Sequence, residues 1–119
     1  MSEKLAKLAA LADMIKEAEL SRLSAAETAR RAISRKSAAV RTAVSDANRN
    51  AEPDAAHASG TAARWHTWAD RRLKALTLQE ATAAAEAEVQ KRAASRAFGR
   101  AAALGRLAQR SNKDRKGPA

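Results

Sequence analysis

Residues that interrupt α-helices are concentrated in the middle of this chain. The segment from Asn48 to Gly60 holds Pro53, two asparagines and a Ser-Gly pair, whereas residues 2–47 and 62–110 contain no proline. Proline removes a backbone donor and clashes with the preceding helical turn, so an uninterrupted helix excludes it from its interior. We therefore predict two long helices, residues 2–47 and 62–110, joined by a turn over residues 48–61.

Two helices of near-equal length around one turn predict an all-α fold, an antiparallel coiled-coil hairpin. Alanine supplies 34 of the 54 hydrophobic residues, which leaves too few large side chains for a globular core. The high charge and few aromatics would also fit a disordered chain, but alanine, leucine and arginine are strong helix formers. Residues 1–110 are predicted as a single hairpin domain, and the aperiodic residues 111–119 as a disordered basic tail.

The large apolar residues of the two predicted helices can be aligned with each other. The first helix carries Leu5, Leu8, Leu11, Ile15, Leu20 and Leu23, and then Ile33, Val40 and Val44. The gap between the two groups indicates a stutter in the heptad repeat. Antiparallel partners have residue numbers with a constant sum, and a sum near 109 pairs the following residues: Val44 with Trp65, Val40 with Trp68, Ile33 with Leu76, Leu20 with Val89, Leu11 with Phe98 and Leu5 with Leu104.

The net charge of +10 is distributed unevenly along the chain. Residues 91–116 hold nine cations and one acid, and within them Arg92, Arg96 and Arg100 recur at every fourth position on one helix face. These cations favour the helix dipole and keep an alanine-rich rod in solution. They also fit a docking face for an anionic partner, either acidic protein or nucleic acid.

No catalytic or metal-binding motif is recognisable in the sequence. The chain has no cysteine, and His57 and His66 are too few for a metal site. Glu80, Glu86 and Glu88 are interpreted as helix-surface acids. Because two helices enclose no concave pocket, we predict a non-enzyme without cofactor or metal. No apolar run approaches the roughly 18 residues of a membrane span, and we expect a cytoplasmic protein.

Two of the three aromatic residues lie just after the predicted turn. Trp65 and Trp68 are three residues apart and share one side of the helix. Two helices cannot easily bury both side chains between them, so we expect one to pack and the other to anchor a partner. Trp65 aligns with Val44 and is predicted as the packed residue, and Trp68 as the anchor.

At these residues the chain resembles a known family. The passage from Ala58 to Trp65, followed by Trp68, Leu73 and Leu76, is similar to the region after the turn in FliJ. FliJ is the coiled-coil stalk protein of the flagellar type III export apparatus, and the YscO stalk proteins of injectisomes are its relatives. The resemblance extends to the layout of two long antiparallel helices, a basic second helix and a loose C-terminal tail.

The resemblance implies a non-catalytic stalk that couples a hexameric export ATPase to the export gate and escorts export chaperones. The ATPase end would comprise Leu5–Ile15, Phe98–Leu107 and four arginines: Arg92, Arg96, Arg100 and Arg106. The gate end would comprise Trp65, Trp68, Arg72 and Leu76, with Val40 and Val44 beneath them. Such a protein would lie in the cytoplasm, peripheral to the inner face of the membrane.

Two other interpretations remain open at this point. A basic helical protein with exposed tryptophans could bind nucleic acid through phosphate contacts and base stacking. A coiled coil could also be a structural adaptor that associates with itself through the tryptophan end. The three interpretations predict different partners: an ATPase, a nucleic acid or a second copy of the chain.

Overall fold

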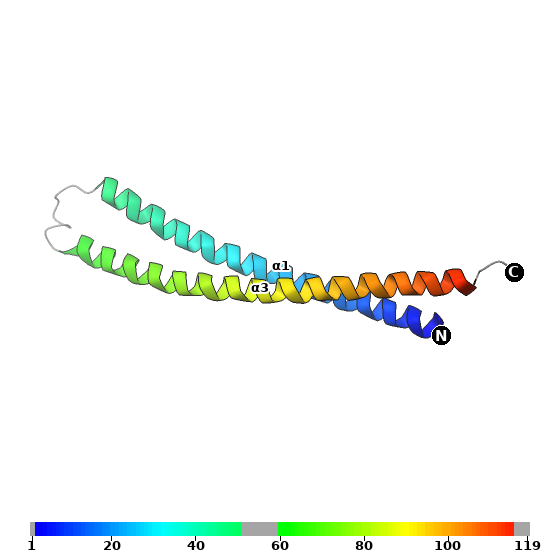
Figure 1. Ribbon diagram of the computed structural model, residues 1–119. Coiled ribbons are helices and arrows are strands. Elements are labelled where there is room, and N and C mark those ends of the chain that lie inside the picture. The colour runs from blue at the N-terminus through cyan, green and yellow to red at the C-terminus, as the bar shows by residue number, and fades with distance from the viewer. Residues whose placement is uncertain (1, 51–59, 116–119) are drawn as a thin grey trace. The chain divides into compact units, whose positions relative to one another are not determined.

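The computed structural model describes residues 2–50 and 60–115, which form two long helices (Figure 1). Helix α1 spans Ser2–Arg49 and helix α3 spans Thr61–Arg115. The predicted all-α hairpin of two packed helices is confirmed. Both helices extend further than expected, and residues 111–115 belong to α3 and not to a tail. Most of the predicted turn, residues 51–59, and the last four residues lie outside the described part of the chain.

The helix ends next to the turn have local polar contacts. Arg49 Nη2 donates to Asp46 Oδ1 at 2.8 Å, and the Asn50 amide donates to the Asp46 carbonyl at 3.0 Å. On the other side, the Arg64 amide donates to the Gly60 carbonyl at 3.0 Å as α3 begins. Gly60 has a φ of 80°, a left-handed conformation that glycine adopts without steric cost. Gly60 therefore lets the chain enter α3 directly from the turn.

The chain divides into two compact units, each with one segment of α1 packed antiparallel on one segment of α3 (Figure 1). The terminal unit combines Met1–Glu27 with Glu86–Ala119, and the turn unit is Thr28–Ala85. In each unit the core is a single line of contact between two helices. We call the inward-facing residues along this line the seam.

The seam follows one unbroken heptad pattern in each helix, with spacings that alternate between three and four. In α1 its partly or fully buried members are Leu5, Ala9, Ala12, Lys16, Glu19, Leu23, Ala26, Ile33, Ser37, Val40, Val44 and Ala47. In α3 they are Ala69, Leu73, Leu76, Glu80, Ala83, Ala87, Gln90, Ala94, Ala97, Ala101, Leu104 and Ala108. Arg30, at the remaining heptad position of α1, is exposed. The predicted stutter is therefore wrong.

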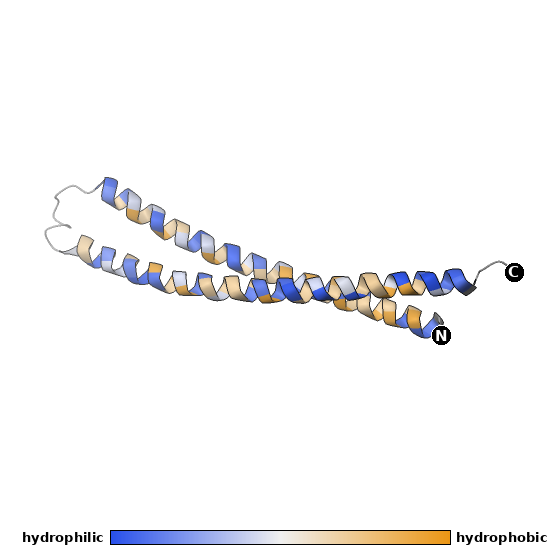
Figure 2. Cartoon of the chain, viewed as in Figure 1, coloured by the Kyte–Doolittle hydropathy of each residue, from blue (hydrophilic) through white to orange (hydrophobic). Residues whose placement is uncertain are grey.

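Alanine, and not leucine, fills most of the seam in the terminal unit. Its buried apolar residues are Ala12, Ala87, Ala94, Ala97 and Ala101. Leu5, Leu23 and Leu104 lie in the seam as expected, but most of the large side chains expected there lie outside it. Orange and blue segments are interspersed along both helices in Figure 2. The exposed large side chains are Leu8, Leu11, Ile15, Leu20, Val89, Phe98 and Leu107. Alanine seams allow close approach of two helices, whereas a seam through Leu8, Leu11 and Ile15 would fall out of register with Ile33 and Val40.

The alignment of the two helices differs from the predicted one by one helical turn. Leu11 and Phe98 were expected to pair, but they are 52% and 58% exposed. Phe98 instead lies beside Lys16, whose Nζ atom is 5.6 Å from the ring centroid, and these residue numbers sum to 114. The two heptad patterns match at a sum of 113, which places Ala12 opposite Ala101 and Ser37 opposite Leu76. The pairing at a sum near 109 is therefore wrong.

Two polar side chains occupy the seam of the turn unit. Ser37 is fully buried, and its Oγ atom has no hydrogen-bond partner. Glu80 is half-buried with an unpartnered Oε1 atom, so the interpretation of this residue as a surface acid is wrong. Leu76 is the one large apolar side chain among the described residues that is buried completely. The turn unit thus combines its best-packed leucine with two unsatisfied polar atoms.

Replacing Ser37 with alanine is expected to raise the free energy of unfolding by about 1 kcal/mol. The change removes a buried hydroxyl without a partner and introduces a better helix former. Ser34→Ala is the matched control. Ser34 is exposed on the same helix, so its replacement changes stability through helix propensity alone. Urea denaturation measures both variants. A loss of stability in Ser37→Ala would mean that the hydroxyl has a hydrogen-bond partner in the native protein.

Candidate functional site

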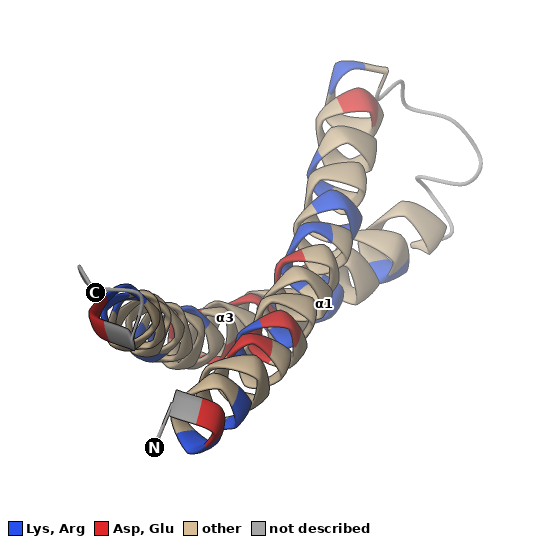
Figure 3. Ribbon diagram, turned by 90° about the vertical axis from the view of Figure 1, so that its right-hand side faces the viewer, with Lys and Arg blue, Asp and Glu red and all other residues tan. Residues whose placement is uncertain are grey.

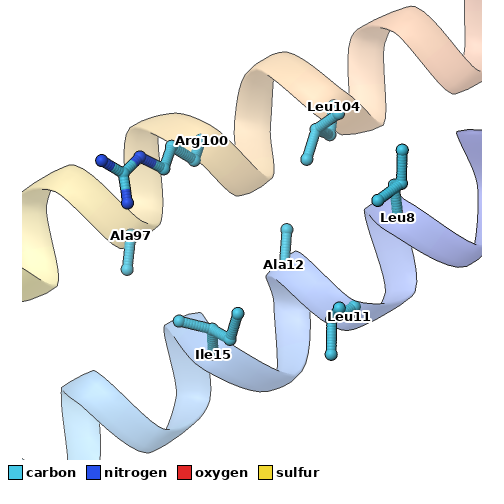
Figure 4. Close-up of a pocket in the computed structure, with 7 residues that line it drawn as sticks. All are labelled: Leu8, Leu11, Ala12, Ile15, Ala97, Arg100 and Leu104. Atoms are coloured by element: carbon cyan, nitrogen blue, oxygen red, sulfur yellow. The ribbon is translucent and has the colours of Figure 1, made fainter.

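An apolar groove lies on one side of the seam in the terminal unit (Figure 4). Its α1 wall is formed by Leu8, Leu11, Ala12 and Ile15, and its α3 wall by Ala97, Arg100 and Leu104. Leu8, Leu11 and Ile15 are each about half exposed. We call this feature the terminal groove. It is bordered by large apolar side chains that the alanine seam leaves outside the helix pair.

The sequence forms the terminal groove because a second heptad row runs beside the seam. Leu8, Leu11 and Ile15 directly precede the seam residues Ala9, Ala12 and Lys16, so they lie about 100° further round the helix at 3.6 residues per turn. The same one-residue offset defines the full row on α1: Lys4, Leu8, Leu11, Ile15, Ala18 and Arg22. On α3 it defines Glu86, Val89, Ala93, Arg96, Arg100, Ala103, Leu107 and Arg110.

Glu86, at one end of the α3 row, is the one acid in these two rows. From Lys4 to Arg22 on α1 and from Val89 to Arg110 on α3, every charged residue is a cation. These cations are Lys4, Arg22, Arg96, Arg100 and Arg110. Arg22 pairs with Glu19 at 2.7 Å, and the other four make no ion pair within residues 2–50 and 60–115. The acids of α1 in the terminal unit occupy other heptad positions: Glu3, Asp13, Glu17, Glu19 and Glu27. Figure 3 shows basic (blue) and acidic (red) residues along these segments. The terminal groove therefore combines an apolar floor with a cationic rim.

The four arginines expected at an ATPase end have different surroundings. Arg92 Nε lies 3.6 Å from Glu88 Oε1 in an exposed pair within α3. Arg96 and Arg106 are exposed. Arg100 lines the terminal groove together with Leu8, Leu11 and Ile15. The structure thus brings one of the four against the apolar residues of α1, and the partner-binding role of all four stays a prediction.

A second candidate surface lies on α3 in the turn unit, around Trp68. A shallow site there is lined by Ala63, Arg64, Thr67, Trp68 and Arg71. Trp68 is 55% exposed, and its ring centroid is 6.4 Å from that of Trp65. Arg64 and Arg71 make no ion pair among the described residues. We call this feature the tryptophan surface.

Trp65 and Trp68 differ in burial as expected. Trp65 is half-buried, and its ring and that of His66 form a T-shaped pair, with the two ring centroids 5.1 Å apart. Trp68 offers more of its ring to solvent. Arg72 is half-buried beside them. The relative burial of the two tryptophans is confirmed, and the role of Trp68 as an anchor stays a prediction.

Leu76 does not belong to an accessible surface. It was expected at the gate end with Trp65, Trp68 and Arg72, but its side chain is 0% exposed. The reason is its heptad position, because Leu76 follows Ala69 and Leu73 along the seam. A partner cannot contact this side chain while the helix pair is intact. Leu76 is therefore a core residue, and its assignment to a partner-binding site is wrong.

Within the described ranges, no three histidine, cysteine or acidic side chains are grouped so that they could hold a metal ion. His57 lies outside these ranges. Neither α1 nor α3 contains a stretch that is apolar enough to span a membrane. The exposed apolar and cationic surfaces are thus the features from which a function can be argued.

Comparison of the chain with protein-family models, curated protein sequences and solved structures finds no match in any of the three. The sequence interpretation missed the terminal groove because it assigned Leu8, Leu11 and Ile15 to the helix interface. The alanine row Ala9–Ala12, which is in phase with Ile33 and Val40, is the signal that could have revealed it.

Proposed function

We propose that this chain is a non-catalytic coiled-coil adaptor that presents surfaces of its helix pair to protein partners. The supporting observation is the placement of large apolar side chains outside the seam, with Leu8, Leu11 and Ile15 gathered in one groove. Exposed apolar clusters with a polar rim are typical of protein-binding surfaces. If the helix pair served only as a spacer, it would need no exposed apolar cluster.

More specifically, we propose the stalk of a type III export apparatus, a role for which the resemblance to FliJ is the argument. The hairpin fold is compatible with it. In this role the terminal unit would enter an export ATPase hexamer, and Trp65, Trp68 and Arg72 would contact the cytoplasmic domain of the export gate. The protein would escort export chaperones and act in the cytoplasm at the inner face of the membrane.

Co-purification at moderate salt tests this role. The tagged full chain is expected to retain the export ATPase and the gate cytoplasmic domain. Trp68→Ala is expected to abolish gate binding with little change in melting temperature, because Trp68 is largely exposed and anchor residues carry much of an interface energy. Leu78→Ala is the control, since Leu78 is 72% exposed on the same helix and outside the tryptophan surface. Retention of neither protein by the unmodified chain would refute the stalk role.

Nucleic-acid binding is a second candidate function, and the tryptophan surface is the observation that favours it. Trp68 is flanked by Arg64 and Arg71 in one shallow site. An exposed indole can stack on a base while guanidinium groups bind phosphates. Random-sequence single-stranded DNA should then bind with a steep salt dependence, and Trp68→Ala should weaken binding. Absence of binding by the unmodified protein at physiological salt would exclude this candidate.

A further inference from the structure

We infer that the terminal groove is the docking site for one amphipathic helix of a partner protein, with apolar residues on one face and acidic residues beside them. The inference rests on the proposed adaptor function and specifies the chemistry of one partner. It depends on three observations: the shape of the groove, the length of the two rows that border it and the sign of the charges on its rim.

The shape and length of the groove fit a third helix. Its apolar floor is contributed by both helices, with Leu8, Leu11 and Ile15 on α1 and Leu104 on α3 (Figure 4). Rows of side chains spaced alternately by three and four residues are the pattern that a packed helix contacts. The α1 row from Lys4 to Arg22 extends about 27 Å at 1.5 Å per residue. A partner helix of about 18 residues would cover it.

The charges select an acidic occupant. Four cations of the rim make no ion pair in the described ranges: Lys4, Arg96, Arg100 and Arg110. From Lys4 to Arg22 on α1 and from Val89 to Arg110 on α3, the two rows contain no acid. Aspartate or glutamate beside the apolar face of a partner helix would lie within reach of these cations, and opposite charges at an interface favour association and specify the partner. The helix-in-groove mode uses the same apolar spacing on the ligand.

A second copy of the chain fits the groove poorly. In a symmetric dimer through this face, the same patch is present on both subunits. Lys4, Arg96, Arg100 and Arg110 would then face identical cations of the other copy, and like charges brought together at an interface oppose association. A symmetric dimer would therefore bring apolar residues of the floor together, which is favourable, but it would also bring the cations of the rim together, which is not.

The test uses the full chain and synthetic helical peptides of about 18 residues with a fluorescent label. One peptide carries leucine at positions spaced alternately by three and four residues, and glutamate at the positions next to these leucines. A second replaces each glutamate with lysine, and a third has the composition of the first in scrambled order. Fluorescence anisotropy gives the dissociation constants. The protein variants are Leu11→Ser, the double variant Arg96→Glu with Arg100→Glu, and the control Leu78→Ser, which alters an exposed leucine of the turn unit.

The glutamate peptide should bind with 1:1 stoichiometry, while the lysine and scrambled peptides should bind at least about tenfold more weakly. Leu11→Ser and the double variant should each weaken binding of the glutamate peptide by at least about tenfold, because anchors and buried charge partners dominate interface energies. Leu78→Ser should leave it unchanged. Equal binding of the scrambled peptide would indicate nonspecific attraction of a polyanion and would overturn the inference. Concentration-dependent dimers that Leu11→Ser abolishes would assign the groove to self-association.

These outcomes are separable from a failure of the proposed function. If the peptide does not bind but the full chain still retains the export ATPase or gate, the adaptor function stands and uses another surface. If the peptide binds as described and neither export protein is retained, the groove has the inferred specificity and the stalk role fails.

Discussion

Replacing Leu76 with alanine is expected to lower the free energy of unfolding by about 2 to 4 kcal/mol. Leu76 is completely buried and is the largest such side chain among the described residues. Truncation removes its contacts across the seam and leaves a cavity that two helices can only partly close. Because small domains have net stabilities of only about 5 to 15 kcal/mol, one such change removes much of the total. Chemical denaturation monitored by circular dichroism measures the effect.

The control for this prediction is Leu78→Ala on the same helix. Leu78 is two residues away and 72% exposed, so the same chemical change should alter stability by no more than about 0.5 kcal/mol. Both variants change helix propensity equally, and only burial distinguishes them. Similar losses in the two variants would show that Leu76 is not the principal packing residue of the turn unit.

Replacing Ala94 with glutamate is expected to destabilise the protein by about 1 to 3 kcal/mol, and replacing it with lysine by much less. Ala94 is 3% exposed, and the heptad alignment at a sum of 113 places it opposite Glu19, whose side chain is 17% exposed. A second carboxylate there would be poorly hydrated and repelled by Glu19. A lysine could extend along the seam and pair with Glu19. Thermal melts at low and high salt measure the difference, which should shrink as salt screens the charges.

This pair of substitutions also tests the register of the two helices. At the predicted sum near 109, Ala94 would lie opposite Ile15, and glutamate and lysine would then be equally unfavourable. Equal losses at low salt would therefore contradict the alignment of Ala94 with Glu19. Ala103, which is exposed on α3, is the matched control site for both changes, because there neither side chain enters the seam.

The two helices could be predicted because the relevant signals are local. Between residues 2 and 98, Pro53 and Gly60 are the only proline and glycine, and Gly60 has the backbone conformation that favours glycine. The end of α3 was placed too early. Ser111 and Asn112 are weak helix formers, but Lys113 suits the negative end of the helix dipole, and the helix continues to Arg115.

The register could not be predicted from the large apolar residues alone. Counting leucines assigns Leu8, Leu11 and Ile15 to the interface, because each would bury more surface than alanine. Only the alanine row continues the alternating spacing of three and four residues that leads to Ile33 and Val40 in α1. The wrong register also explains two errors in the predicted sites. Leu8, Leu11 and Ile15 of the groove were assigned to the core, and Leu76 was assigned to an accessible surface.

The alanine seam has a consequence for how stability changes with temperature. Unfolding a globular domain raises the heat capacity by about 12 to 15 cal/mol/K per residue, because apolar surface becomes hydrated. A seam of Ala12, Ala87, Ala94, Ala97 and Ala101 hides little such surface, and the large side chains outside it are hydrated already. The heat-capacity increment per residue should be smaller, and the curve of stability against temperature correspondingly flatter. A partner that covers the leucines would restore that curvature, so calorimetry could detect the assembled state without knowledge of the partner's identity.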